Sequence, residues 1–145
     1  MPANTSPIFT VTPKITWGST NPITTVNTGT AASSYDGTTN ANLIFTAGSN
    51  GSFCQKLILE AAGTNAISVM RIHINNGSTN ATASNNVLFM SFSLPATTAS
   101  NTTSTPHLEL PITCQIPAGY KIYVSFGAAA NLASGWHVSC IGGDY

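Results

Sequence analysis

The sequence predicts a single all-β domain, an antiparallel β-sandwich or jelly roll of about eight strands, preceded by an extended N-terminal arm. Short apolar segments alternate with polar residues at the period of two that a strand imposes. Turn residues separate these segments every 8–12 residues or so, as is typical of sandwiches. No segment has a clear 3.6-residue period, and the best helical candidate, 128–133, is too short to be stable alone.

The N-terminal part of the chain, residues 1–17, is expected to be an arm followed by an edge strand. Residues 1–7 contain two prolines and few apolar side chains, so we expect an arm that is free or lies on a neighbouring subunit. Residues 8–17 have the pattern of one strand interrupted by Pro13, which lacks an amide hydrogen and therefore favours a sheet edge or a bulge. The sandwich domain is then expected to comprise residues 18–145.

The middle of the chain contains further short apolar segments between polar loops. The strands expected from residue 18 onward are 23–26, 42–47, 53–60, 66–74, 87–94, 107–114, 120–126 and 136–141. The long loops rich in Thr, Ser and Asn are 27–42, 75–86 and 96–105. In the strand 53–60, alternation predicts Phe53 on the same face as Leu57, with Cys54 on the opposite face.

The last two expected strands have the clearest pattern, and we expect them to pair as a hairpin that closes the sandwich. Alternation places one apolar set in the core: Tyr120, Ile122, Val124, Phe126, Trp136, Val138 and Cys140. The reverse face carries Tyr123, Ser125, His137 and Ser139 and has Lys121 as its one charge. We therefore expect that reverse face to be covered by another subunit, with Tyr123 as the contacting aromatic residue.

The surface is expected to be almost free of charge. The chain has four Lys/Arg and four Asp/Glu, so charged residues are 6% of the sequence, against about 25% in average domains. Asn, Ser and Thr provide the polarity instead, with 51 of the 145 residues. A net charge of zero favours association between copies. Four scattered cations neutralise few phosphates, so we expect neither nucleic acid nor a membrane surface as a partner.

Cellular location is predicted from the N-terminus and the cysteines. The first residues lack the basic and apolar regions of a signal peptide, and no apolar run reaches the ~20 residues of a membrane span. An odd number of cysteines (Cys54, Cys114 and Cys140) argues against a disulfide framework and for synthesis in a reducing compartment. We expect buried free cysteines and no zinc, because no Cys-x-x-Cys pair is present.

No motif in the sequence predicts catalysis, so we expect a protein that is not an enzyme and has no cofactor or metal. His73, His107 and His137 fall in three different expected strands, where a metal site is geometrically possible but has no supporting spacing. A glycosidase needs two facing carboxylates, and Glu60 and Glu109 are the sole plausible pair. Ion pairs with cations on neighbouring strands are the simpler interpretation of both.

Two stretches of the chain resemble small jelly-roll proteins of tailed-phage virions. One is the C-terminal stretch, Pro117–Ser125 and Gly135–Tyr145; the other is the strand that carries Arg71 ahead of the Asn-Gly turn at Gly77. The resemblance covers roughly residues 42–145. It implies a capsid decoration (cement) protein, often a trimer, that clamps neighbouring subunits on the outer capsid surface after synthesis in the host cytoplasm.

The expected partners are therefore other copies of the chain, as a trimer, and the major capsid protein. The residues that we expect at subunit interfaces are Ile8, Phe9, Val11, Trp17, Tyr123, His137 and Tyr145. The alternative is a tail, fibre or lectin-like module that binds host-surface glycan, since aromatic residues beside Asn and Thr suit sugars. In that case the three long loops would carry specificity.

Overall fold

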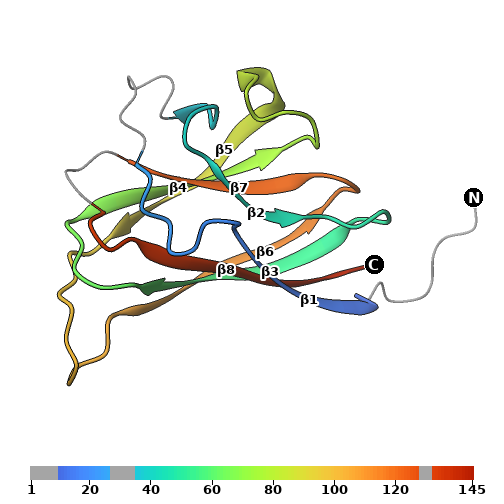
Figure 1. The fold of residues 1–145 in the computed structure, drawn as a ribbon. Helices are drawn as coiled ribbons and strands as arrows, with labels where there is room; N and C mark the ends of the chain where they lie inside the picture. The colour runs from blue at the N-terminus through green and yellow to red at the C-terminus, as the bar shows by residue number, and fades with distance from the viewer. Residues whose placement is uncertain (1–9, 27–34, 128–131) are drawn as a thin grey trace, which may run out of the picture.

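The computed structural model describes residues 10–26, 35–127 and 132–145. Two four-stranded antiparallel sheets pack face to face (Figure 1), so the predicted β-sandwich is confirmed. The strands are β1 (Thr12–Trp17), β2 (Asn42–Thr46), β3 (Ser52–Ala61), β4 (Ser68–Asn75), β5 (Asn86–Leu94), β6 (His107–Ile116), β7 (Lys121–Phe126) and β8 (Trp136–Asp144). A short 3-10 helix, η1 (Ala83–Asn85), precedes β5.

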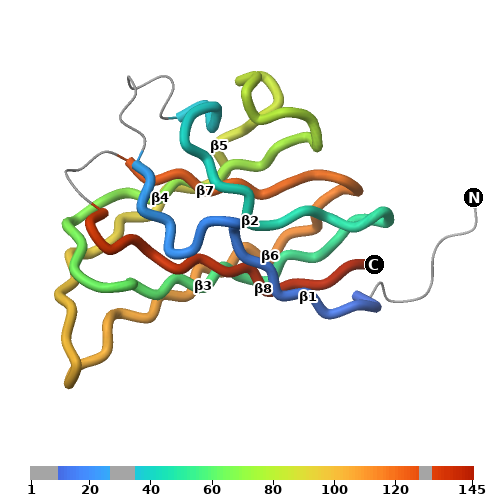
Figure 2. Tube along the Cα trace, in the orientation of Figure 1, coloured from blue at the N-terminus to red at the C-terminus, as the bar shows by residue number. Residues whose placement is uncertain are grey.

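The strand order is that of a jelly roll. The first sheet has the order β1-β8-β3-β6, and the second has the order β2-β7-β4-β5. Apart from β4 and β5, strands that follow one another along the chain lie in opposite sheets, so the chain crosses repeatedly between the two layers (Figure 2). Eight strands in two such sheets form the double Greek key of a jelly roll.

The predicted closing hairpin is wrong, because β7 and β8 lie in different sheets. β7 pairs with β2 and β4, whereas β8 pairs with β1 and β3. Both strands turn an apolar face to the same core. Alternation within each strand predicts that buried face, but two strands can share a core either side by side or across it.

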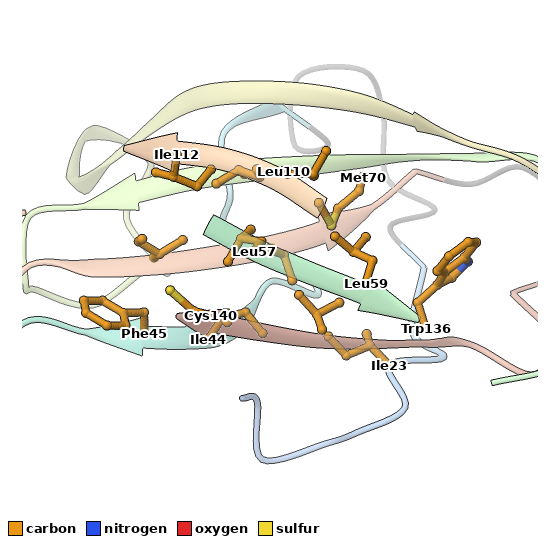
Figure 3. Close-up of a cluster of buried hydrophobic side chains, with 14 of the residues drawn as sticks. Ile23, Ile44, Phe45, Leu57, Leu59, Met70, Leu110, Ile112, Trp136 and Cys140 are labelled. Carbon is orange, nitrogen blue, oxygen red and sulfur yellow. The ribbon is translucent and has the colours of Figure 1, made fainter. Parts of the chain in front are cut away.

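The core lies between the inner faces of the two sheets (Figure 3). Six of the seven residues predicted from the last two strands are buried there: Ile122, Val124, Phe126, Trp136, Val138 and Cys140. Tyr120 is only partly buried against this cluster. Ile23 is also fully buried, yet it forms a single bridge to Trp136, so the strand expected at 23–26 is wrong.

A bulge in β3 changes which residues face the core. The pairing register shifts between Cys54 and Lys56 on both sides of β3. Against β8, Gln55 is the extra residue, whereas against β6 the extra residue lies on β6, between Pro111 and Cys114. Cys54 therefore points inward with Leu57, and Phe53 is only half-buried. The predicted faces of this strand are wrong at its N-terminal end, because strict alternation does not allow for a bulge.

β1 lies at the edge of the first sheet, with β8 as its neighbour. Pro13 is inside it, opposite Gly143, and an edge strand tolerates the missing amide hydrogen. The division of the chain at residue 17 stays a prediction. The expected arm lies outside the described residues, as do most of the helical candidate and half of the first long loop.

Candidate functional site

The outward face of β1, together with Val11 just before the strand, carries a row of exposed large apolar side chains. Val11, Ile15 and Trp17 are 81%, 64% and 62% exposed; we call these three residues the β1 strip. Because side chains alternate along a strand, the intervening Lys14 and Thr16 turn toward the body of the sandwich. The strip is therefore one continuous apolar row along a sheet edge.

The β1 strip borders a hollow where the edges of the two sheets meet. The hollow measures about 410 Å³ and lies between β1 and β2, which are edge strands of opposite sheets. Trp17 and Leu43 line it, and Leu43 is 39% exposed. An edge strand offers unpaired backbone N–H and C=O groups to another chain. This side of the sandwich thus combines apolar side chains with free backbone groups.

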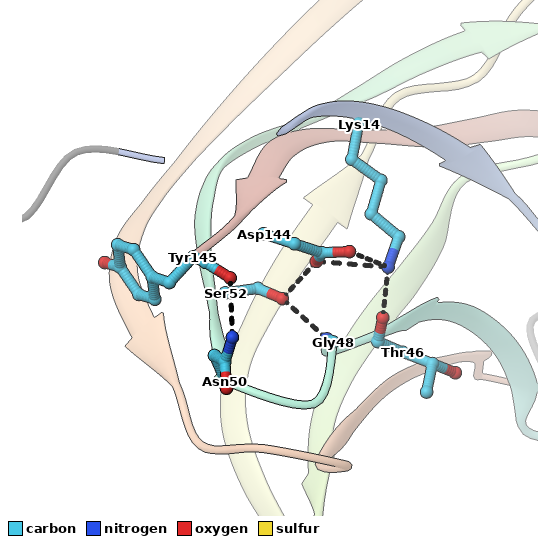
Figure 4. Close-up of polar contacts among 7 residues, drawn as sticks. All are labelled: Lys14, Thr46, Gly48, Asn50, Ser52, Asp144 and Tyr145. Atoms are coloured by element: carbon cyan, nitrogen blue, oxygen red, sulfur yellow. Dashed lines mark hydrogen bonds and ion pairs between the residues drawn. The ribbon is translucent and has the colours of Figure 1, made fainter. Parts of the chain in front are cut away.

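A polar network fixes β1 to the body of the protein (Figure 4). The Lys14 ammonium donates to the carbonyl of Thr46 at 2.7 Å and forms an ion pair with Asp144 at 3.1 Å. Ser52 donates to the same carboxylate and accepts a hydrogen bond from the amide of Gly48. The network ties β1 and β8 to the turn between β2 and β3, so the β1 strip has a rigid support.

The structure tests where the predicted interface residues lie in the subunit. Val11 and Trp17 lie exposed at the two ends of the β1 segment, His137 is exposed on β8, and Tyr145 is half-buried. Ile8 and Phe9 lie outside the described residues. Ile15 and Leu43 are also exposed on this side of the sandwich but were not among the predicted residues. Period-two spacing would have indicated Ile15, since it stands two residues before Trp17 on the same face.

Tyr123 is buried within the subunit, although we expected it to contact another subunit. Its side chain is only 9% exposed, and its neighbour Ser125 is fully buried. The expectation that this face of β7 is uncovered is therefore wrong. Residues of the chain itself cover part of the outer side of the second sheet: the Tyr35 ring lies 4.3 Å from the Arg71 guanidinium, and Gly37 packs on the His73 ring.

Arg71 and His73 form a buried polar cluster with Ser125. His73 Nε2 lies 3.0 Å from Ser125 Oγ, while Nδ1 has no hydrogen-bond partner among the described residues. Burial, helped by the nearby charge of Arg71, lowers the pKa of His73, and Asp36 opposes this more weakly. The cluster has the character of a buried structural contact, with a neutral imidazole held beneath residues 35–37.

This cluster predicts a pH dependence of stability. The unfolded chain binds a proton on His73 with the usual pKa of about 6.5, but the folded chain binds it only at lower pH. Below about pH 6.5 the unfolded state therefore holds more protons, and stability falls as the pH falls. We expect His73 to contribute a slope of up to ~1.4 kcal/mol per pH unit in urea unfolding, which His73→Gln removes.

His107 provides a control of opposite sign. Its hydrogen bond with Glu60 raises its pKa, so its contribution is present below pH ~6.5 and is lost as the pH rises through the raised pKa. His107→Gln should remove a gain of stability that the wild type shows as the pH falls toward ~6.5, and should leave the loss of stability below pH ~6.5 unchanged. If His73→Gln leaves the wild-type dependence of stability on pH unchanged, the buried imidazole of His73 is not the group that causes it.

The two carboxylates weighed as a catalytic pair are held in ion pairs on the outer face of the first sheet. Lys56 pairs with Glu109 at 2.7 Å, and His107 lies 2.9 Å from Glu60. The hydrogen bond from Lys56 lowers the pKa of Glu109. The Lys56–Glu109 contact is a cross-strand ion pair of the kind expected from the sequence, whereas the partner of Glu60 is a histidine.

The three histidines do not converge. His73 is buried in the second sheet, whereas His107 and His137 flank Glu60 on the outer side of the first. Across residues 10–26, 35–127 and 132–145, no group of three His, Cys, Asp or Glu side chains is arranged to hold a metal ion. None of the helical turns in those ranges has the length and apolarity of a membrane span.

The long loops separate into two regions. Residues 35–40 and 76–86 lie together, joined by hydrogen bonds from Asn86 to the carbonyl of Asp36 and from Asn80 to that of Gly37. Loop 96–105 projects elsewhere, at the lower left of Figure 1. Asn side chains in the first region are occupied in bracing the loops, and Tyr35 is engaged with Arg71. The described loops therefore do not form one shared glycan-binding surface.

Comparison with known proteins gives a single distant likeness. No protein-family model and no curated protein matches the chain. The chain is similar to part of a solved structure of infectious bursal disease virus, Gt strain, with 10% sequence identity and a TM-score of 0.34. The similarity covers 92% of this chain and 32% of that chain, so the protein spans about a third of the length of the viral chain.

Proposed function

We propose that the protein is a non-enzymatic structural component of a virion, a capsid decoration protein that self-associates on the outer capsid surface. In this proposal it forms a trimer and clamps neighbouring copies of the major capsid protein. The observation that carries the proposal is the β1 strip, three large exposed apolar side chains along the edge of a jelly roll. Covering apolar surface of this kind with another protein removes it from water and so lowers the free energy of the assembly.

The chemistry of the strip favours a protein partner. Jelly rolls occur in viral capsid and lectin domains alike, so the fold does not choose between them. A sugar site needs polar groups that converge around its aromatic residue. The outward row of β1 instead places Pro13 and Ile15 beside Trp17, which suits the apolar centre of a protein interface.

A second copy of the chain is the partner that we expect to bind the β1 strip. β1 has β8 on one side and no strand of the described residues on the other, so its free edge can accept another strand. All eight charged residues already make contacts, among them Lys121 with the carbonyl of Gly77. Two copies would therefore approach with little electrostatic repulsion.

We expect the double variant Ile15→Thr, Trp17→Thr to weaken self-association by at least tenfold. Threonine keeps the β-branched shape that strands favour but removes most of the apolar area. The control is Ile67→Thr, Val87→Thr, whose residues are 66% and 58% exposed outside the strip. Analytical ultracentrifugation measures both variants, and circular dichroism confirms that both are folded.

Mixing with undecorated capsids tests the partner. We expect the wild-type protein and the control to bind capsids and raise their resistance to heat, and the strip variant to do neither. A stable wild-type monomer without capsid affinity would contradict the proposal. Binding to a glycan array that is lost on changing loop residues would favour the alternative of a host-recognition module.

A further inference from the structure

Two buried thiols meet in the core of the first sheet. Cys54 Sγ on β3 lies 3.1 Å from Cys140 Sγ on β8, and both side chains are fully buried. Bonded sulfurs are ~2.05 Å apart, so the two atoms need to approach by about 1 Å. β3 and β8 are the two central strands of their sheet. A covalent link here would therefore join the middle of the sheet.

The bulge in β3 creates this encounter. Strict alternation would point Cys54 away from the core, but the extra residue Gln55 turns it inward to the face that Cys140 occupies. The residue directly opposite Cys54 on β8 is Gly142. Because glycine has no side chain, nothing on β8 separates the Cys54 sulfur from that of Cys140.

We propose that Cys54 and Cys140 form a modification site, at which a peroxide oxidises the two thiols to an intramolecular disulfide between β3 and β8. The hydrogen bond between the thiols prepares the pair: it lowers the pKa of Cys54 and raises that of Cys140. Cys54 is then the more acidic thiol and the first nucleophile, since the thiolate is the reactive form.

The reaction balances with one molecule of hydrogen peroxide. The Cys54 thiolate attacks one peroxide oxygen, the O–O bond breaks, and hydroxide leaves to take up the Cys54 proton as water. Cys140 then attacks the sulfur of the Cys54 sulfenic acid, forming the S–S bond. The sulfenic oxygen leaves as hydroxide and takes the Cys140 proton, so two thiols and one peroxide give one disulfide and two waters.

Cys114 is the competing partner. It lies on β6 directly opposite Cys54 and is half-buried. Burial raises its pKa, which makes it a poorer nucleophile at neutral pH. The short sulfur–sulfur contact joins Cys54 to Cys140, so we expect Cys114 to remain a free thiol.

The test is a peptide map of the peroxide-treated folded protein. The reduced chain is titrated with hydrogen peroxide, quenched, alkylated in denaturant and digested with trypsin. Cleavage after Lys14, Lys56, Arg71 and Lys121 places the three cysteines in separate peptides: 15–56, 72–121 and 122–145. We expect 15–56 linked to 122–145, and 72–121 alkylated.

Variants and stability measurements sharpen the result. Cys114→Ser should still form the link, and Cys140→Ser should not. Oxidation of the wild type should raise its melting temperature by several degrees, reversibly with dithiothreitol, because the link closes a long loop. Three alkylated thiols, a link from 15–56 to 72–121, or a link between two chains would overturn the proposal. The wild-type map decides this even if Cys140→Ser does not fold, and it needs no capsid.

Discussion

Trp136→Ala is expected to lower the free energy of unfolding by about 3–5 kcal/mol, the usual cost of removing a buried aromatic side chain. Trp136 is fully buried at the start of β8 and belongs to the core cluster. Its backbone also pairs with Ile23, so it links the segment before β2 to the first sheet. Its removal leaves a large cavity between the sheets, which the surrounding strands close only in part. Urea unfolding followed by circular dichroism measures the loss.

Trp17→Ala is the matched control, because the chain has two tryptophans in opposite environments. Trp17 is 62% exposed on β1, so its truncation should change the stability of the isolated subunit by no more than about 0.5 kcal/mol. The same change should weaken self-association, which Trp136→Ala affects only through unfolding. Equal destabilisation by the two substitutions would contradict the assignment of their environments.

Gly142→Ala is the second change from which we expect a large loss of stability. The expected decrease in the free energy of unfolding is about 1–3 kcal/mol. A Cβ atom at Gly142 would collide with the carbonyl oxygen of Phe53 and come within 3.3 Å of the Cys54 Cα. Both are backbone atoms of β3, so no side-chain rotation relieves the clash. Two central strands of the first sheet must move apart, which disturbs the pairing beside the β3 bulge. Thermal unfolding at matched concentration measures the effect.

Gly119→Ala separates this steric effect from backbone strain. Gly119 has a φ of +73°, but a Cβ there meets nothing within 4 Å. Its replacement should cost only the conformational penalty of a left-handed residue, roughly 1–2 kcal/mol. If Gly119→Ala proves the more harmful of the two, close packing of β8 on β3 is not what requires glycine at 142.

The sequence predicted the local features of the fold well, because they depend on neighbouring residues. Period-two alternation identified seven of the eight strands closely and placed Val124 and Trp136 in the core. Pro13 indicated an edge strand, and β1 lies at an edge. Spacing from Trp17 would have added Ile15 to the expected interface, and the association expected from the scarcity of charge stays a prediction.

Only the tertiary structure decided which strands are neighbours and which outer face is covered. Alternation is the same whether two strands pair within a sheet or face each other across a core, so the partners of β7 and β8 were not determined. His73 is buried beneath a segment that lies nearly 40 residues earlier in the sequence, and the buried Tyr123 lies opposite it on β7. The contact of Cys54 with Cys140 required a bulge that alternation cannot indicate. Each of these features depends on contacts between segments that are distant in the sequence, and a local alternation pattern does not determine which distant segments pair.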